Sequence, residues 1–284
     1  MVAVTIGVFA QAFSVNYLDG TAEVKTAKGW KALSIGDQVA SDASVRISQS
    51  GSLELQKGKV KITLLKDGIY DMASLAKASD KAGAGGVGTA IAQKLQSLTT
   101  EKAKGGTVGG VRGAQQGGTE DVTWVDENDE TRTQAQSLID QKKYKEAVAL
   151  LNQAIDDSTG DADKAELTYL VGTAYYGQGQ TARAYRTLST ISPQPDAAWY
   201  ARYVILKSQV LVDSGNYKDA LGTLSPFIST YPTGEATQMA YLLTYYCQKG
   251  LGDLASARVA LDTGFKLDPA TETAKMIDQQ RKAE

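Results

Sequence analysis

Histidine is absent from this chain of 284 residues, and cysteine occurs only once. Without histidine the chain lacks the usual general base, the Ser-His and Cys-His nucleophile pairs, and the commonest metal ligand. The single Cys247 stands among apolar residues and cannot form a disulfide within the chain, so we expect a small core residue. These absences favour a protein that is not an enzyme and that has no cofactor, no metal site and no catalytic residues.

Long apolar runs are also missing, because no stretch of about 18 apolar residues that could span a membrane follows the first residues. The opening run VAVTIGVFAQA is short and ends in Ala10-Gln11-Ala12, the small-x-small pattern that signal peptidase cleaves. A positively charged region does not precede it, and a first β-strand is the alternative. We expect residues 1–12 to be a signal peptide, with cleavage near Ala12 and a soluble mature protein that is periplasmic or otherwise exported.

Neither sign of charge dominates the whole chain, since the formal net charge is -2, which gives no indication of nucleic-acid binding. The charge is unevenly distributed. Residues 1–119 carry 14 basic and 9 acidic side chains, whereas residues 120–284 carry 16 and 23. Because the length also suits two ordinary domains, we expect two domains of different chemistry.

Short alternating runs fill residues 15–69, among them SVRISQSG, SLELQKG and KVKITLLKDG. Runs of about 5 to 10 residues separated by Gly, Asp or Ser are typical of a meandering antiparallel sheet. The clearest hairpin turns at Lys57-Gly58. It places four apolar side chains on one face: Leu53, Leu55, Val60 and Ile62.

The segments LDGTAEV, GWKALSIGDQV and SVRISQSGSLELQKGKVKITL resemble the periplasmic domain of the FecR family. The resemblance covers residues 15 to about 71, and TVGGVRGAQ at residues 107–115 is similar to the strand that closes such modules. The family implies a β-rich module that acts in bacterial envelopes in signal relay or with polymers and carries no catalytic residues. We therefore expect a FecR-like β-domain at residues 13–118, with a helical insertion at about residues 72–105.

The expected insertion contains a G-x-G-x-x-G pattern at Gly83, Gly85 and Gly88. In dinucleotide-binding proteins this pattern follows a buried strand, but the preceding DMASLAKASDKA cannot form one. We interpret the pattern as a glycine hinge before a short amphipathic helix that either packs on its surroundings or serves as a mobile docking element. Ser74 and Lys77 spell S-x-x-K, yet the S-D-N and K-T-G partners of penicillin-recognising enzymes are absent.

Lysines are frequent in this first half, which is compatible with binding of an anionic wall polymer. The alternative is that they solvate an exposed sheet face and protect its edges. They are Lys25, Lys28, Lys31, Lys57, Lys59 and Lys61.

The second half repeats itself, and its equivalent positions lie 36 to 37 residues apart. The segments LTYLVGTAYYGQGQTARAYRTLSTI, YVILKSQVLVDSGNYKDALGTLSPF and YLLTYYCQKGLGDLASARVALDTGF align, and AQSLIDQKKYKEAVALLNQAI precedes them. This period predicts four helical hairpins in a solenoid. One equivalent position is occupied by Tyr144, Thr181, Tyr217 and Leu254.

The repeats resemble the tetratricopeptide repeat (TPR), in which small residues let the two helices of a hairpin touch and a glycine ends the first helix. The first hairpin lacks that glycine, and the fourth has Tyr245 where a small residue is usual. We expect a TPR-like domain at residues 130–284, after an acidic linker at residues 119–129. The matching small residues and glycines are Ala135, Gly172, Ser208, Gly179, Gly215 and Gly252, followed in the second helices by Ala147, Ala184, Ala220 and Ala257.

The first helix of each hairpin lines a concave groove in the TPR family, and that resemblance implies a mixed aromatic and basic groove here. Such a groove would suit an extended peptide with an aromatic or acidic end. A solvated groove without a ligand is the alternative. The family spacing places nine residues in it: Arg132, Gln136, Tyr169, Thr173, Tyr176, Arg202, Gln209, Tyr246 and Lys249.

Together these patterns predict a multi-domain β plus α protein, with a small β-module followed by an all-α helical repeat. The expected function is a non-enzymatic scaffold of the bacterial cell envelope. It would bind a protein or peptide in the groove and an envelope component through the β-module, so that each contact raises the effective concentration of the other. The alternative is a module that binds peptidoglycan or polysaccharide, with the repeats as a spacer.

Overall fold

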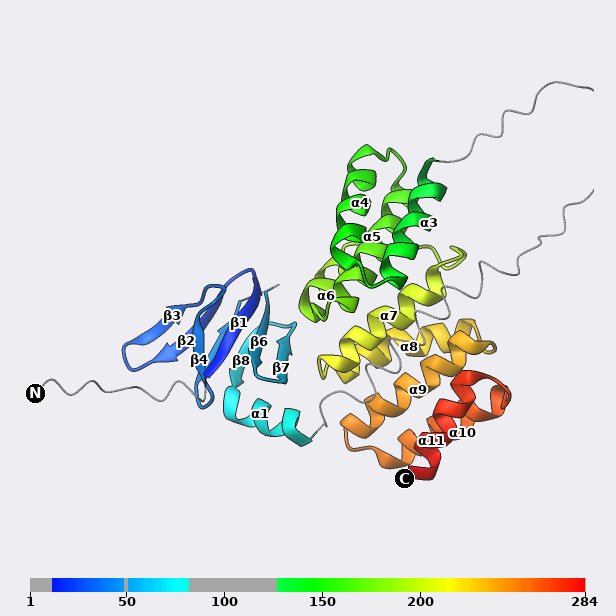
Figure 1. Ribbon diagram of the computed structural model, residues 1–284. Helices are drawn as coiled ribbons and strands as arrows, with labels where there is room; N and C mark the ends of the chain where they lie inside the picture. Colours follow the sequence, from blue (N-terminus) through cyan, green and yellow to red (C-terminus); the bar gives the residue numbers. More distant parts are fainter. Residues whose placement is uncertain (1–11, 49–50, 82–126, 284) are drawn as a thin grey trace, which may run out of the picture.

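A computed structural model describes residues 12–48, 51–81 and 127–283 of the chain (Figure 1). The part before residue 82 is a β-module with one helix, and the part after residue 126 is entirely helical. Several predictions fall outside the described residues: the signal peptide as far as residue 11, the glycine pattern, the strand at residues 107–115, the helix after the glycines, and most of the acidic linker.

The β-module consists of two antiparallel four-stranded sheets rather than one meander. The first sheet has the order β4-β1-β6-β7 and the second β3-β2-β5-β8. Alternation of apolar residues fixes which face of a strand is buried but not which strand it pairs with, and here β1 pairs with the distant β6. The strands are β1 (Ala12–Asp19), β2 (Ala22–Thr26), β3 (Gly29–Ala32), β4 (Gln38–Ala40), β5 (Ser44–Ile47), β6 (Ser52–Lys57), β7 (Val60–Leu64) and β8 (Gly68–Asp71).

The predicted hairpin is confirmed, because Lys57 pairs with Val60 and Gly58 takes a left-handed φ of 58°. Leu53, Leu55 and Ile62 are buried in the core of the β-module, and Val60 packs partly against it. The core also contains side chains from the other strands, such as Phe13, Val15, Val39, Val45 and Ile47.

A β-bulge lies in β1 between Val15 and Tyr17. Because successive side chains of a strand alternate between faces, the extra residue reverses which positions point inward. Val15 therefore faces the core between the sheets, whereas Tyr17 packs against the helical part of the protein. The bulge therefore places the side chain of Tyr17 on the outer face of the first sheet, where it contacts the helices.

Helix α1 (Met72–Lys81) occupies the segment before the glycine pattern. Met72 is buried in the β-module core, and Asp71 accepts hydrogen bonds from the backbone N–H of Ser74 at 3.0 Å and from its Oγ at 2.5 Å. Asp71 therefore caps the start of α1, as short polar side chains often do, and Ser74 of the S-x-x-K pattern is its hydrogen-bond donor.

The predicted hairpins are confirmed, since the four repeat positions are each the first residue of a second helix. The first helix begins at Glu127, three residues before the expected start of the domain, and α11 follows the fourth hairpin. The helices are α3 (Glu127–Asp140), α4 (Tyr144–Asp157), α5 (Asp161–Gly177), α6 (Thr181–Ser189), α7 (Tyr200–Asp213), α8 (Tyr217–Thr230), α9 (Glu235–Gly250), α10 (Leu254–Leu267) and α11 (Glu272–Ala283).

The turns within the hairpins use a left-handed residue in every repeat. Gly179, Gly215 and Gly252 have φ of 73°, 71° and 85°. In the first hairpin, which lacks the glycine, Lys142 takes this conformation with φ of 60°, unlike any other non-glycine residue among those the structure describes.

Replacing Lys142 with glycine is expected to stabilise the protein by roughly 0.5–1 kcal/mol, because the side chain destabilises a left-handed backbone by more than glycine gains in unfolded entropy. Urea unfolding followed by circular dichroism would measure it. Gly215→Ala is the matched control and should destabilise. Equal effects of the two changes would contradict this explanation.

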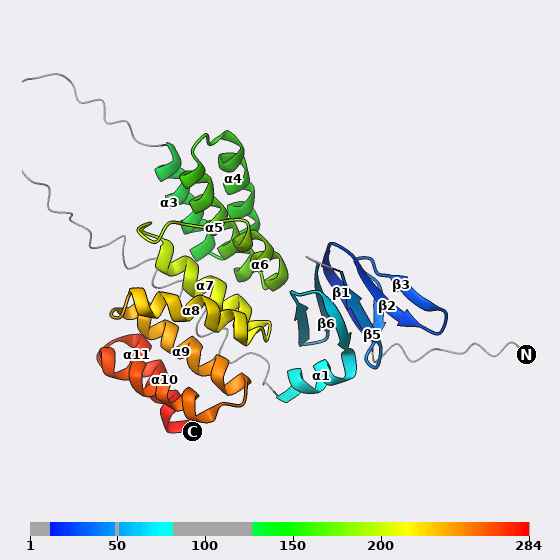
Figure 2. The ribbon, with the colours of Figure 1, turned by 180° about the vertical axis from the view of Figure 1, so that it is seen from behind.

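The β-module lies beside the middle of the helical array in both views (Figures 1 and 2), and β6 and β7 contact α6. Leu65, directly after β7, is 7% exposed and belongs to the helical core cluster. The outer face of the first sheet is therefore a junction with the helices.

Candidate functional site

The predicted groove residues form three groups, and the first surrounds Glu166 on α5. Arg132 reaches from α3 to Asp163 at 3.2 Å and to Glu166 at 3.3 Å, and also pairs with Asp129 at 3.4 Å within α3. Burial raises the pKa of Glu166, while Arg132 and Arg202 oppose that shift. The two arginines therefore have an acidic neighbour, and this part of the surface is less basic than the sequence predicted.

Tyr169 belongs to the same neighbourhood but is only 3% exposed. Its ring stacks on Trp199 with the centroids 5.4 Å apart, and Thr173 donates a hydrogen bond to its carbonyl oxygen at 3.0 Å. The ring of Tyr169 therefore stabilises the contact between successive repeats and offers little surface to a partner. Trp199, which lies just before α7, is not among the residues that the repeat spacing predicts for the groove.

The second group surrounds Asp213 at the end of α7. Its Oδ2 accepts from the hydroxyl of Tyr176 at 2.6 Å, and its Oδ1 accepts from Nε2 of Gln209 at 2.6 Å. Desolvation raises the pKa of Asp213 although the residue is exposed overall, whereas these two hydrogen bonds and the charge of Lys61 act in the opposite direction. Asp213 holds two predicted groove residues in place, although the repeat spacing did not predict it as a groove residue.

The orientation of Gln209 leaves its oxygen without a donor. Because the carboxylate of Asp213 requires a donor, the amide nitrogen must face it and Oε1 must face away. Gln209 is fully buried, and its Oε1 has no hydrogen-bond partner among the described residues.

The third group surrounds Tyr245 on α9. Lys249 donates to its hydroxyl at 2.9 Å, and the ring of Tyr246 meets that of Tyr245 edge-on with centroids 4.8 Å apart. Burial raises the pKa of Tyr246. Elsewhere, Gln136 donates to Asp140 at 2.9 Å within α3. The exposed Lys249 and the half-buried Tyr246 remain accessible at this end of the array.

Where the β-module meets the array, Glu54 on β6 is almost fully buried, at 4% exposure. Its Oε2 accepts from the backbone N–H of Ala182 at 3.3 Å, and its Oε1 pairs with Lys61 Nζ at 3.2 Å. Lys61 also donates to the carbonyl oxygen of Gly179, in the turn before α6. The ion pair of Glu54 and Lys61 therefore contacts two parts of the helical array. Lys61 contacts the turn before α6, and Glu54 contacts the start of α6.

More exposed ion pairs border this contact. Arg186 on α6 pairs with Asp19, and Lys66 pairs with Asp219 on α8 at 2.5 Å. The basic partner comes from the helices in the first pair and from the β-module in the second. These two ion pairs therefore do not both follow the opposite net charges of the two halves.

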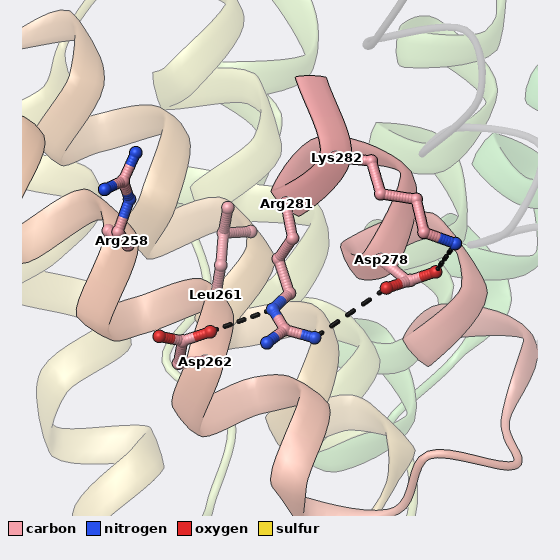
Figure 3. A pocket seen from close by; sticks show the side chains of 6 residues that line it. All are labelled: Arg258, Leu261, Asp262, Asp278, Arg281 and Lys282. Atoms are coloured by element: carbon pink, nitrogen blue, oxygen red, sulfur yellow. Dashed lines mark hydrogen bonds and ion pairs between the residues drawn. The ribbon is translucent and has the colours of Figure 1, made fainter. Parts of the chain in front are cut away.

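A shallow pocket of about 370 Å³ lies between α10 and α11 (Figure 3). Arg281 pairs with Asp262 at 2.8 Å and with Asp278 at 3.7 Å, and Lys282 pairs with Asp278 at 2.5 Å. The acidic and basic side chains largely neutralise one another, which gives no nucleophile activated by a base. The residues that line this pocket are Arg258, Leu261, Asp262, Asp278, Arg281 and Lys282.

Cys247 is fully buried, as the sequence predicted. Burial raises the pKa of its thiol to about 12, so almost no reactive thiolate exists at neutral pH. Within the described ranges, His, Cys, Asp and Glu side chains do not gather in any group that could hold a metal ion, and none of the helices is long and apolar enough to cross a membrane.

The hairpins, their small contact residues and their left-handed turns agree with a known repeat. Residues 138–209 match the tetratricopeptide repeat family. Two solved structures are similar in part. "MamA 41-end from Desulfovibrio magneticus RS-1" is 20% identical with a TM-score of 0.44, covering 55% of this chain and 86% of that one. "MamA RS-1 ArsTM double mutant" is 21% identical with a TM-score of 0.43, covering 56% and 88%. Among curated proteins, none matches this chain.

The TPR match begins at the end of α3 and runs through α4, α5, α6 and most of α7, and the same hairpin geometry continues through α10. TPR arrays are generally protein-binding scaffolds. Of the nine predicted groove residues, Tyr169 and Gln209 are buried, and the other seven retain some exposed surface.

Proposed function

We propose that this protein is a non-enzymatic scaffold of the bacterial cell envelope that binds a protein or peptide along its TPR array. The observation that carries the proposal is the array of four regular hairpins in which Tyr176, Arg202 and Lys249 remain partly or fully exposed on the first helices. These side chains combine aromatic surface with donors that suit carboxylates and peptide carbonyls.

Export to the periplasm is part of the proposal and rests on the expected signal peptide at residues 1–12. A FecR-like identity of the β-module would agree with that location, and two packed antiparallel sheets are compatible with it. In this arrangement the β-module would engage an envelope component while the array holds its partner.

Site-specific photo-crosslinking in the native envelope tests the groove. A crosslinker placed at position 202 should capture a partner, whereas one at Lys218, exposed on the second helix α8, should not. With the purified partner, the full-chain double variant Arg202→Ala, Lys249→Ala should bind at least about tenfold more weakly, and Lys218→Ala should bind normally. Equal capture from both positions, or unchanged affinity of the double variant, would reject the groove.

A second candidate, binding of an anionic wall glycan, is favoured by the second sheet. Trp30 on β3 lies under the guanidinium of Arg46, with the carbon of that group 4.6 Å from the ring centroid, and Lys25 and Lys31 are exposed nearby. Lys61, by contrast, belongs to the junction with the helices. The full chain should then bind peptidoglycan sacculi, and Trp30→Ala, but not the groove double variant, should abolish retention.

A further inference from the structure

Among the second helices of the four hairpins, α6 differs from the others in how it begins. The other three have an acidic side chain at their start: Glu146 in α4, Asp219 in α8 and Asp253 before α10. The first turn of α6 contains no acidic residue, and Arg183 stands where α4 has Glu146 and α8 has Asp219. Because the N-terminus of a helix carries a partial positive charge, a carboxylate stabilises this end and an arginine does not.

The β-module supplies the carboxylate that α6 lacks. Oε2 of Glu54 accepts from the backbone N–H of Ala182, and the side chain is almost fully buried at this position. Lys61 balances the charge of Glu54 at 3.2 Å and also donates to the carbonyl oxygen of Gly179 in the turn before α6. The start of α6 therefore has its carboxylate only while the β-module is docked.

The β-module also reaches the start of α8, which belongs to the third hairpin. Nζ of Lys66 pairs at 2.5 Å with Asp219, the acidic residue in the first turn of that helix. Leu65, next to it in the chain, is buried in the helical core cluster. Because Lys61 and Lys66 are only five residues apart, one short segment of the β-module contacts the second and the third hairpin together.

A contact with two successive hairpins restrains how they turn relative to each other. In a helical solenoid each repeat contacts its neighbours, and the small rotation from one repeat to the next sets the curvature of the array. The hydrogen bonds and ion pairs named above go to α6, to α8 and to the turn before α6. The β-module therefore holds the two hairpins at their second helices, and the first helices, which line the predicted groove, follow this spacing.

We propose that the β-module is a clamp across the second and third hairpins, which completes the start of α6 and fixes the rotation between these two repeats. The inference goes beyond the proposed function, because it assigns the β-module a role in shaping the array that needs no ligand. In both views, strands β2 and β3 lie on the side of the β-module away from the array (Figures 1 and 2). The clamp therefore also holds Trp30, on β3, in a fixed direction relative to the groove.

Hydrogen exchange of the Ala182 amide in the full chain tests whether Glu54 completes α6. The first N–H groups of a helix have no acceptor within the helix, so protection of this amide depends on Glu54. In Glu54→Ala, we expect it to exchange at least about tenfold faster, while amides in the paired strands β1 and β6 stay slow. Glu23→Ala on the second sheet is the matched control and should leave the rate unchanged. A wild-type rate in Glu54→Ala would show that α6 begins without the β-module, which would overturn the proposal.

The clamp itself is tested at Lys66, an exposed position outside the strands. Although Lys66 pairs with α8, Lys66→Glu should accelerate exchange of the Ala182 amide in α6 several-fold, because one docked unit holds both helices. Adding Asp219→Lys reverses the ion pair and should restore the slow rate, and Lys31→Glu on the second sheet is the matched control without effect. If Lys66→Glu leaves the Ala182 rate unchanged, or if Asp219→Lys does not restore it, the two hairpins are not clamped together. No partner is added, so the outcome is independent of whether the groove binds a peptide.

Discussion

Replacing Tyr245 with alanine is expected to lower the free energy of unfolding by about 3–5 kcal/mol, the range for loss of a buried aromatic side chain. The TPR resemblance alone would suggest the opposite, because a small residue is usual at this position and Ala135 occupies it in the first hairpin. In this protein, however, Tyr245 is 1% exposed and belongs to the helical core cluster. The helices that surround Tyr245 are spaced to hold its aromatic ring, so alanine would leave a cavity between them.

Guanidinium unfolding followed at the helical circular dichroism band would measure the change, with exchange of α9 amides as a local readout in case the repeats unfold separately. Tyr245→Phe is the control, since it keeps the ring and loses only the hydroxyl that accepts from Lys249. It should cost about 1 kcal/mol. If the alanine variant costs no more than the phenylalanine variant, the fourth hairpin can close like the others and our explanation is wrong.

The helical repeats could be predicted from sequence because their signals are local. Most hairpins carry their own turn glycine and small contact residues within one repeat, and the four equivalent positions that set the period are the first residues of the second helices in the structure. Lys142 shows the limit of such patterns, since the chain adopts the left-handed turn even where the glycine is missing. Here the packing of the two helices imposes the left-handed backbone on Lys142, which is held in a strained conformation.

The junction could not be predicted, because a strand face that contacts another domain looks like one that contacts water. The run SLELQK alternates apolar and polar residues, which indicates a half-buried strand. In the structure both faces are buried, and Ser52 and Glu54 are as inaccessible as Leu53. Only the three-dimensional position of the helices shows that Glu54 has a helix end rather than water as its neighbour.

The groove was predicted in part. Regular spacing identified residues on the first helices, but spacing does not show which of them neutralise one another. Gln209 and Asp213 are four residues apart on one helix, a signal that was available from sequence. Tyr176 lies on α5 and Asp213 on α7, so their contact joins two successive repeats and depends on how the hairpins stack.

Stacking of the hairpins also gives the second large prediction, that Gly250→Ala destabilises the protein by about 1–3 kcal/mol through overpacking. A Cβ at Gly250 would lie 2.3 Å from Cε2 of Tyr217, the first residue of α8. Gly177 has the same relation to Tyr144, with 2.4 Å to Cε1. In both places a tyrosine that begins one second helix packs against a glycine that ends the next first helix.

Gly222→Ala is the matched control, because Gly222 is exposed within α8 and, apart from its chain neighbours and the backbone of its own helix, no atom lies within 4 Å of the position of its Cβ. Alanine there should stabilise the helix by roughly 0.5–1 kcal/mol, so the two identical substitutions should have opposite signs. The double variant Gly250→Ala, Tyr217→Leu would test the mechanism, since a smaller side chain at position 217 should recover part of the loss. If Gly250→Ala stabilises as Gly222→Ala does, the tyrosine ring moves aside freely and does not fix the spacing between hairpins.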